Sequence, residues 1–330
     1  MTGPIRKLVL IMLILAGTQQ VSSQKIFKIN RLVDSVLSVR YHRVDIDTNY
    51  VVRPQTKWTL LGRVNLSGAR ISTKGVEEGR HFSSEMTADS KLTISAGVSF
   101  MGLTLSFAIN PAKMMGKYHD YELGLRSYGK RFGFDIAYQD ASNFKGWNEV
   151  DGARQDVATT EDIFKLRTLN VNAYYVFNHR RFSYPAAFAH SYIQRRSAGS
   201  FLLAASGQGQ HGKLSDDVSS IDFKMTNIAL GGGYGYNYVP ARGWLLHLSA
   251  LPTLIVYSNT SLTVDDTRFP LHYHFPEVII TGRGSVVKQI GHSMFAGLSM
   301  VYNFINIGDK ESLTVHNEKW LARAYFGFRL

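Results

Sequence analysis

The stretch NEKWLARAYFGFRL, residues 317–330, decides the fold of this chain. Every second residue from Trp320 is apolar, and this set comprises Trp320, Ala322, Ala324, Phe326, Phe328 and Leu330. The residues between them include Arg323, Tyr325 and Arg329. Because successive side chains of a β-strand point to opposite faces, the pattern predicts a strand with one face suited to lipid and the other to water.

The same alternation recurs along most of the sequence. It predicts about twelve strands, at residues 58–67, 91–100, 103–110, 120–128, 132–139, 166–177, 198–208, 223–238, 243–257, 278–288, 292–305 and 319–330. An even number of antiparallel strands with lipid-facing and lumen-facing residues in alternation is typical of outer-membrane barrels. We therefore expect an all-β, closed, up-and-down transmembrane β-barrel over residues 58–330, whose last strand is bound by the barrel assembly machinery.

The start of the sequence predicts export. Arg6 and Lys7 precede a short apolar run at residues 8–16, and small residues form a cleavage site before Gln24. This order of segments is that of a secretory signal peptide, so we expect residues 1–23 to be removed. The apolar run is about half the ~20 residues that a membrane-spanning helix requires.

Residues 24–57 are predicted to be an N-terminal periplasmic segment. Within it, Leu32, Val33, Val36 and Leu37 recur at helical spacing, which predicts a short amphipathic helix at residues 30–40. We expect this helix to lie at the mouth of the barrel in the periplasm.

Composition limits the possible chemistry and partners. The 330 residues include no cysteine, which excludes disulfides, thiol catalysis and thiolate metal sites. The net charge of +12 favours anionic partners, and the basic residues are dispersed without a nucleic-acid-binding motif. The expected partners are therefore outer-membrane lipid, lipopolysaccharide and anionic solutes, with no nucleic acid and no cofactor.

Connection lengths predict the orientation, because such barrels have short periplasmic turns and long extracellular loops. The segments 68–90, 111–119, 140–165, 211–222, 258–277 and 306–318 are long and polar, whereas most of the alternate connections are short. Residues 178–197 (NHRRFSYPAAFAHSYIQRRS) are the exception, being long where a short turn belongs. They are predicted to form an ordinary long turn with an interfacial aromatic and arginine belt, a helix at the periplasmic rim, or a segment folded into the lumen. A periplasmic protein partner at residues 178–197 is also expected.

Three motifs resemble a known family. The runs RFSYPAAFAHSYIQRRSAGSF (Arg181–Phe201), DTNYVVRP (Asp47–Pro54) and YGKRFGFDIAYQ followed by FKGW (Tyr128–Trp147) are similar to the Bacteroidota outer-membrane barrel family of unknown function numbered 4421. The resemblance covers most of the mature chain. It implies a barrel and its location, and it implies neither an activity nor any functional residue.

One pair of residues suggests catalysis. His247 and Ser249 stand two apart on a predicted strand, so the imidazole would lie beside the hydroxyl, as in a lipid-modifying hydrolase. However, the wholly apolar face of that strand contains Leu246 and Leu248, so His247 and Ser249 are predicted to point into the lumen. Asp265 and Asp266 with His272 and His274 are a weaker candidate for a metal site, because no further fixed ligand accompanies them.

The predicted lumen-facing residues suggest a function. They are mixed in charge but mostly basic, comprising Arg63, Lys91, Glu122, Arg126, Asp135, Arg283, Arg323 and Arg329. Buried charges need partners, so we expect arginine–carboxylate bridges across the interior, with the surplus arginines favouring anions. The sequence thus predicts a non-enzymatic barrel that is either a narrow pore for small anionic solutes or a structural or assembly subunit. The alternative is a lipid-modifying hydrolase using His247 and Ser249.

Overall fold

The computed structural model describes residues 45–330 except 78–79, 89–90, 101–102, 112–120, 143, 159–163, 216–219, 265–266, 272–275 and 310–312. The predicted signal peptide (residues 1–23) and the predicted helix at residues 30–40 lie outside the described residues. Asp265, Asp266, His272 and His274 lie outside them as well. Among the helices that are described, none has the length and hydrophobicity to cross a membrane.

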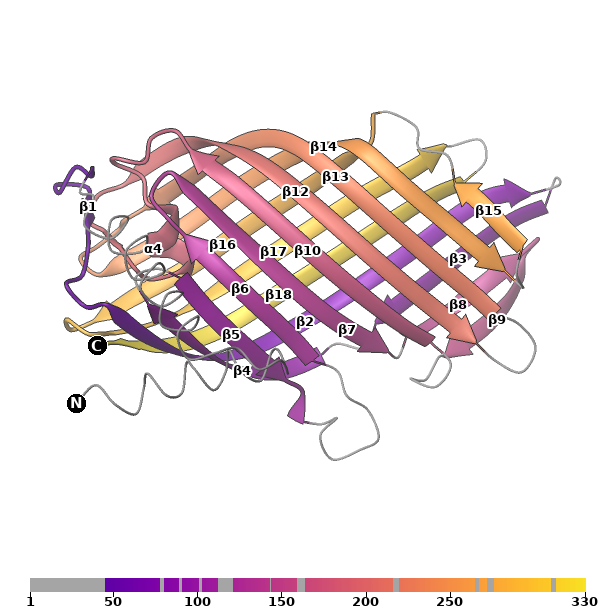
Figure 1. Cartoon of the computed structure of the whole chain (residues 1–330), viewed down its shortest axis with the longest axis horizontal. Coiled ribbons are helices and arrows are strands. Elements are labelled where there is room, and N and C mark those ends of the chain that lie inside the picture. Colours follow the sequence, from indigo (N-terminus) through magenta and orange to yellow (C-terminus); the bar gives the residue numbers. More distant parts are fainter. Residues whose placement is uncertain are drawn as a thin grey trace, which may run out of the picture. The chain divides into compact units, whose positions relative to one another are not determined.

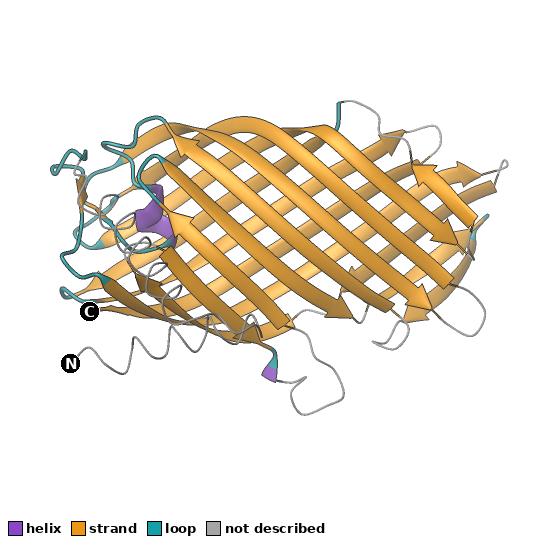
Figure 2. Ribbon diagram, viewed as in Figure 1, coloured by secondary structure: helices purple, strands orange, loops and turns teal. Residues whose placement is uncertain are grey.

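Twelve strands of the described chain form a closed antiparallel barrel, as predicted (Figures 1 and 2). In order around the cylinder they are β2 (Trp58–Glu77), β4 (Lys91–Phe100), β5 (Leu103–Ile109), β6 (Tyr121–Tyr128), β7 (Phe132–Ser142), β10 (Phe164–Val176), β12 (Ala198–Ser215), β13 (Ser220–Tyr238), β14 (Trp244–Val264), β16 (Val278–Ile290), β17 (Met294–Asp309) and β18 (Leu313–Arg329). β18 pairs with β2 from Arg329 opposite Thr59 to Leu313 opposite Gly75. Closure pairs both edges of the sheet, which a strand protein in lipid requires.

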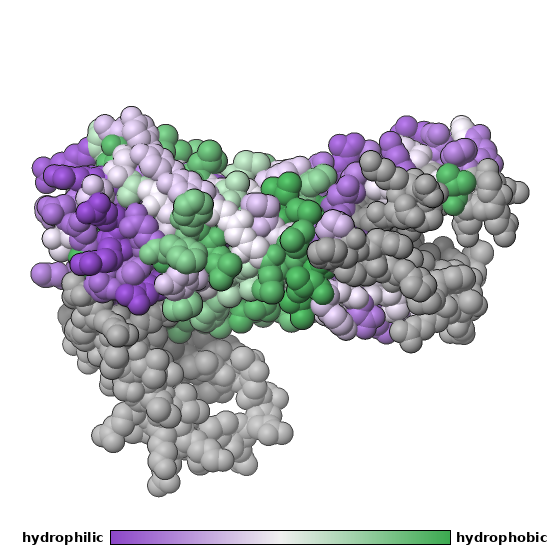
Figure 3. Space-filling model, turned by 90° about the horizontal axis from the view of Figure 1, so that it is seen from above, coloured by the Kyte–Doolittle hydropathy of each residue, from purple (hydrophilic) through white to green (hydrophobic). Residues whose placement is uncertain are grey.

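The faces of the strands follow the sequence pattern. On β2, Leu60, Val64 and Leu66 are more than 40% exposed, whereas Arg63 and Asn65 are buried. On β14, Leu248 is 74% exposed while His247 and Ser249 are buried. Figure 3 shows hydrophobic residues gathered around the middle of the visible face and hydrophilic residues toward the ends. Exposed leucine, valine and phenylalanine side chains form the outer surface because lipid, and not water, would cover them.

Several predicted loops are wrong, because the strands continue through them. β2 extends to Glu77 and pairs with β3 (Arg80–Ala88), which pairs in turn with β8 (Phe144–Val150) and β9 (Ala153–Ala158). β15 (Thr267–Leu271) pairs with β14. These segments contain too few apolar residues to give a sustained alternation of hydrophobicity, although the backbone ladder continues through them. The periodic signal detects contact with lipid, and it ends before the strands do.

The two ends of the barrel differ. At the first, here called the turn end, residues 129–131, 239–243 and 291–293 connect neighbouring strands. The C-terminal residue Leu330 lies at the same end and exchanges backbone hydrogen bonds of 2.9 and 3.1 Å with Trp58. At the opposite end, here called the loop end, β2 and β14 extend beyond their predicted bounds and pair with β3 and β15. The turn end also holds the segment that departs from this simple pattern, residues 178–197 (Figure 1).

Candidate functional site: a plug, its strap and a lumen chamber

Residues 178–197, here called the plug, fold into the lumen. The plug contains the short helix α4 (Tyr184–Phe188) and the two-residue strand β11 (Ile193–Gln194). Of the predicted alternatives, the ordinary interfacial turn is therefore wrong and the folded-in segment is confirmed. A chain of apolar residues between two arginine pairs is compatible with either arrangement, and only the lumen wall decides which one forms.

Local sequence explains the shape of the plug. Ser183 caps α4, because its hydroxyl accepts a hydrogen bond of 3.2 Å from the backbone N–H of Ala186, and Pro185 lies in the first turn. The side chain of Gln194 then joins the end of the plug to its beginning. Its Oε1 accepts from the Ser183 backbone N–H at 2.9 Å, and its Nε2 donates to the carbonyl of Arg181 at 2.6 Å.

The apolar side of the plug fills the barrel at the turn end. Phe182, Tyr184, Ala186 and Ala187 are at most 2% exposed. They pack against inward side chains of the wall that include Leu61, Tyr128, Tyr174, Leu202, Leu245, Leu251, Val287 and Phe295. Burial of this many apolar and aromatic side chains is the main favourable contribution to docking of the plug.

Buried polar residues of the wall hold the backbone of the plug. Asn237 is completely buried, and its Nδ2 donates to the carbonyl of Ser183 and to Oε1 of Gln194, both at 2.9 Å. Arg329 donates from Nε to the carbonyl of His190 at 2.9 Å and from Nη1 to Gln289 at 2.8 Å. The guanidinium also lies 4.6 Å from the centre of the Phe295 ring. Arg329, predicted to line the lumen, therefore anchors the plug.

His247 and Ser249 belong to the same network. His247 Nδ1 donates to Oδ1 of Asn237 at 2.7 Å, which leaves Nε2 to accept from the Ser249 hydroxyl at 3.0 Å. This Ser–His–Asn geometry resembles that of an activated serine. However, the rings of Phe182, Tyr184 and Phe188 surround His247, and both His247 and Ser249 are buried inside the barrel. Their inward position, predicted from the strand parity, is confirmed, so they do not face acyl chains as the lipid-hydrolase alternative requires.

Residues 45–54, here called the strap, cross the turn end and hold the plug from outside. Val51 and Val52 form strand β1 (Val51–Val52), which pairs with β11. Val51 is 1% exposed and packs with Ala186 and Ala187 of the plug. The Tyr50 carbonyl accepts a hydrogen bond of 2.7 Å from the Arg195 backbone N–H. No hydrophobic periodicity marks the strap in the sequence, although DTNYVVRP was one of the motifs of the family resemblance.

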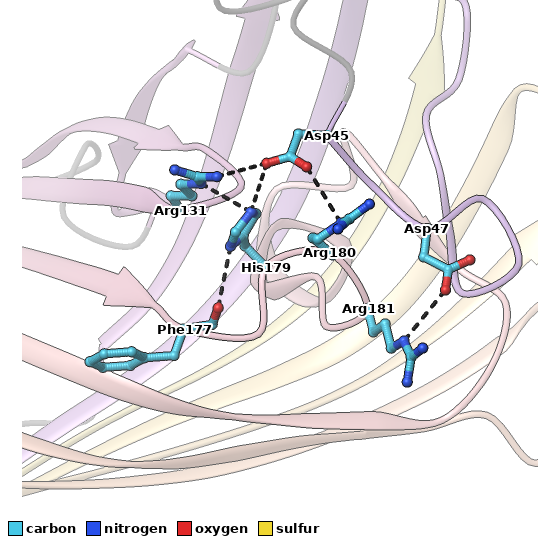
Figure 4. Close-up of polar contacts among 7 residues, drawn as sticks. All are labelled: Asp45, Asp47, Arg131, Phe177, His179, Arg180 and Arg181. Atoms are coloured by element: carbon cyan, nitrogen blue, oxygen red, sulfur yellow. Dashed lines mark hydrogen bonds and ion pairs between the residues drawn. The ribbon is translucent and has the colours of Figure 1, made fainter.

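An ionic cluster fastens the beginning of the strap (Figure 4). Asp45 Oδ2 lies 2.7 Å from Nη2 of Arg131 and 2.9 Å from Nε2 of His179, and its Oδ1 lies 3.5 Å from Nε of Arg180. Asp47 lies 3.4 Å from Nε of Arg181. The hydrogen bonds from His179 and Arg131 lower the pKa of Asp45 to about 2. The strap thus joins the plug to the turn between β6 and β7.

A chamber of about 240 Å³ lies in the lumen beyond the plug. Its described wall carries four cationic side chains, Arg126, Arg283, Lys319 and Arg323, and two carboxylates, Asp135 and Asp140, which gives a net charge of +2. Seven carboxamide side chains and five serine or threonine hydroxyls form most of the remaining polar wall. Arg283 Nη2 lies 3.6 Å from Asp135 Oδ2, which confirms an arginine–carboxylate bridge across the interior.

The predicted lumen residues therefore fall into two groups along the barrel axis, one at the chamber and one at the plug. Arg126, Asp135, Arg283 and Arg323 line the chamber. Arg63 is buried opposite Tyr325, whose ring contacts His190 of the plug, and Arg329 anchors the plug. The structure does not describe the side chains of Lys91 and Glu122. Sequence reasoning missed Asn237, an amide between two tyrosines, and Gln194, which precedes two arginines and carries no comparable signal.

Comparison with known proteins identifies a family. Residues 45–330 match the family model described as a domain of unknown function, DUF4421. No curated protein sequence matches the chain. Among solved structures, the chain is similar to the outer-membrane protease OmpT of Escherichia coli, with 8% identity, a TM-score of 0.42 and coverage of 84% of this chain and 97% of that one.

Two further barrels show similar levels of likeness. The β domain of the Bordetella autotransporter BrkA has 11% identity and a TM-score of 0.34, with 83% of this chain and 100% of that chain covered. OprG of Pseudomonas aeruginosa has 10% identity and a TM-score of 0.30, with 83% and 97% covered. At these identities and TM-scores, none of the likenesses extends to function.

Proposed function

This chain belongs to the family described as a domain of unknown function, DUF4421, and we propose that it is a non-enzymatic outer-membrane barrel that conducts small anionic solutes when its plug is displaced. The observation that carries the proposal is the combination of a closed turn end and a chamber of net charge +2 above it. A cationic polar lumen favours anions. The docked plug makes conduction conditional.

The exposed hydrophobic belt and the placement of the short turns support an orientation. We assign the turn end, with the plug and the strap, to the periplasm and the loop end to the outside, in contact with lipopolysaccharide. In this orientation the chamber lies on the outer side of the plug, which separates it from the periplasm. The strap is the continuation of the N-terminal periplasmic segment, so a force or a binding event on that segment would reach the plug directly.

Single-channel recording in planar bilayers tests this proposal. The refolded mature protein should be silent, and replacing residues 178–197 by a short glycine-serine turn should give steady anion-selective openings. In that opened background, Arg283→Glu with Arg323→Glu changes the chamber charge from +2 to −2 and should invert the selectivity. Openings with unchanged selectivity would refute the role of the chamber, and a silent deletion variant that still shows the heat-modifiable mobility of a folded barrel would refute the role of the plug.

A second candidate function is favoured by the outer surface of the plug. Arg180, Arg181, Arg195 and Arg196 are exposed at the turn end, where a structural or assembly partner in the periplasm would meet them. If the barrel is such a subunit, Arg195→Glu with Arg196→Glu should release a protein that co-purifies with the unaltered barrel. Equal recovery of that protein with both forms would exclude these arginines as its binding site.

A further inference from the structure

Four exposed cations, here called the outer cation cluster, lie close together at the loop end of the barrel. They are Lys165 and Arg167 on β10, Lys213 on β12 and Lys224 on β13. These three strands lie side by side in the sheet (Figure 1). The four cations have the parity of the exposed residues Leu169, Leu203 and Ile228 on the same strands. Because alternate residues of a strand share a face, the cluster lies on the outside of the cylinder and not in its lumen.

The register of the strands places like charges next to one another. Lys165 lies directly opposite Lys213. Arg167 lies opposite His211, which lies opposite Lys224 on the next strand. The Cβ atoms of directly opposite residues are about 5 Å apart, and like charges in such positions are unfavourable. An anion bound between the strands would relieve this repulsion.

Two described carboxylates contact the cluster and leave it cationic. Asp222 lies 3.8 Å from Nζ of Lys213 and 3.5 Å from Nζ of Lys224, and Asp140 lies 3.6 Å from Nε of Arg167. Four cations and two carboxylates give a net charge of +2 with the nearby histidine neutral. The side chains of Arg167, Lys213 and Lys224 are 59%, 65% and 61% exposed, so their charged groups are accessible to a ligand.

The cluster lies where the hydrophobic belt of the barrel ends. Phe201, which is 69% exposed on β12, marks the edge of the belt nearest the turn end. A belt about 25 Å tall, crossed by a strand tilted by about 45° with a rise of about 3.3 Å per residue, contains about 11 residues of that strand. This length places the other edge of the belt close to His211 and Lys213. The cluster is therefore at the level of the lipid headgroups on the loop side.

A strip of small residues leads from the cluster into the belt. It consists of Ala205, Gly207 and Gly209 on the outer face of β12. A Cβ at either glycine would meet no atom of the described chain within 4 Å. Val171 of β10 and Ile228 of β13 lie on either side of Gly207 and are 39% and 45% exposed. The strip is thus a shallow apolar channel in which a hydrocarbon chain would contact side chains on both sides.

We propose that the outer cation cluster and the strip together bind one phosphorylated lipid, with its phosphate on the cluster and an acyl chain along the strip. Lysine and arginine bind phosphate through charge-assisted hydrogen bonds. A free phosphate would occupy only the cluster, and an uncharged lipid only the strip. The orientation proposed above makes this lipid a lipopolysaccharide of the outer leaflet. Binding itself requires neither conduction nor movement of the plug, so this proposal and the proposed function can fail separately.

Native mass spectrometry of the intact, detergent-solubilised mature protein tests the proposal, with diphosphorylated lipid A as probe. Lipid A without its phosphates is the matched ligand, because it has the same acyl chains. The diphosphorylated form should bind at least about tenfold more tightly, since its phosphates contact several cations at the membrane surface. Equal affinities of the two forms would overturn the proposal. Displacement of lipid A by an equal concentration of inorganic phosphate would identify a free-phosphate site and would overturn it as well.

A double variant tests the cluster. Lys165→Gln with Lys213→Gln should weaken binding of diphosphorylated lipid A by about tenfold or more and leave binding of the dephosphorylated form unchanged. The control is Arg70→Gln with Lys74→Gln, which removes two exposed cations from the loop end of β2, on the opposite side of the closed barrel from β12. If both double variants bind the probe equally well, the phosphate is bound elsewhere and the site is refuted.

A second double variant tests the strip. Gly207→Ile with Gly209→Ile fills the channel, and the open space at both positions allows the larger side chains without overlap at Cβ. This variant should weaken binding of both forms of lipid A by a similar factor, because it removes the contacts of the acyl chain and none of the charges. Unchanged affinity for both forms would show that no acyl chain lies along the strip.

Discussion

Removal of the Phe182 side chain is the most direct test of the plug as a gate. Phe182 has no exposed surface, and its ring lies 5.9 Å from the ring of His247 and 6.3 Å from that of Tyr184. Replacement of a buried phenylalanine by alanine costs about 3–5 kcal/mol, through lost burial and the cavity left behind. Because Phe182 belongs to the plug and its partners Leu202 and Leu251 belong to the wall, this cost falls mainly on docking.

The expected magnitude follows from that cost. With a factor of ten for each ~1.4 kcal/mol, Phe182→Ala should raise the ratio of undocked to docked plug by about a hundredfold to a few thousandfold. Single-channel recording should show this as a corresponding rise in open probability over the unaltered protein. The control is Phe132→Ala, which removes the same ring from a position 65% exposed on the outer face and should leave the open probability unchanged.

The result that would refute this reasoning is equally specific. If Phe182→Ala folds to a heat-modifiable barrel and its open probability equals that of the unaltered protein, the plug does not gate the lumen. If Phe132→Ala opens the channel as much as Phe182→Ala does, the effect comes from general loosening of the barrel. Either outcome would remove the main support for conditional conduction.

Two further predictions concern the strap and the wall. Because the pKa of Asp45 is lowered to about 2, its carboxylate stabilises the docked strap fully above the ordinary pKa of 3.8 and loses this effect as the pH falls toward 2. The open probability should therefore rise below about pH 4. Asp45→Asn should abolish this pH dependence, and a pH dependence that persists in the variant would belong to another group. Gly327→Ala should destabilise the barrel by about 1–3 kcal/mol, because a Cβ at Gly327 would overlap the buried ring of its cross-strand partner Phe295. Gly62→Ala is the control and should be nearly neutral, because the nearest atom to a Cβ there is 4.0 Å away. Urea unfolding midpoints in detergent compare the two variants, and equal midpoints would contradict the overlap.

Much of the barrel was accessible from the sequence. Alternation of apolar and polar residues predicted twelve strands, their faces and the inward positions of His247 and Ser249, because each residue on a membrane strand meets either lipid or lumen. The same signal failed where the strands leave the lipid. β2 continues to Glu77 and β8 and β9 form beyond the predicted strands, because backbone pairing there no longer depends on an apolar face.

The site was only partly accessible. Lumen charges such as Asp135 and Arg283 followed from strand parity, but their pairing joins residues far apart in sequence, which only closure of the barrel brings to 3.6 Å. The segment 178–197 was recognisable as anomalous by its length and its aromatic content. Its sequence did not determine whether it lies at the rim or inside, because its apolar residues could be covered by acyl chains at the membrane interface or by the lumen wall.

What the sequence by itself determined is thus the local alternation, and with it the strands, their faces and the closed barrel. The tertiary structure decided which groups meet inside. Asn237 of the wall binds Ser183 and Gln194 of the plug, and Asp45 of the strap reaches Arg131 and His179. These contacts join segments that are far apart in the sequence, and the alternation along a strand carries no information about them. They hold the plug and the strap across the turn end of the barrel.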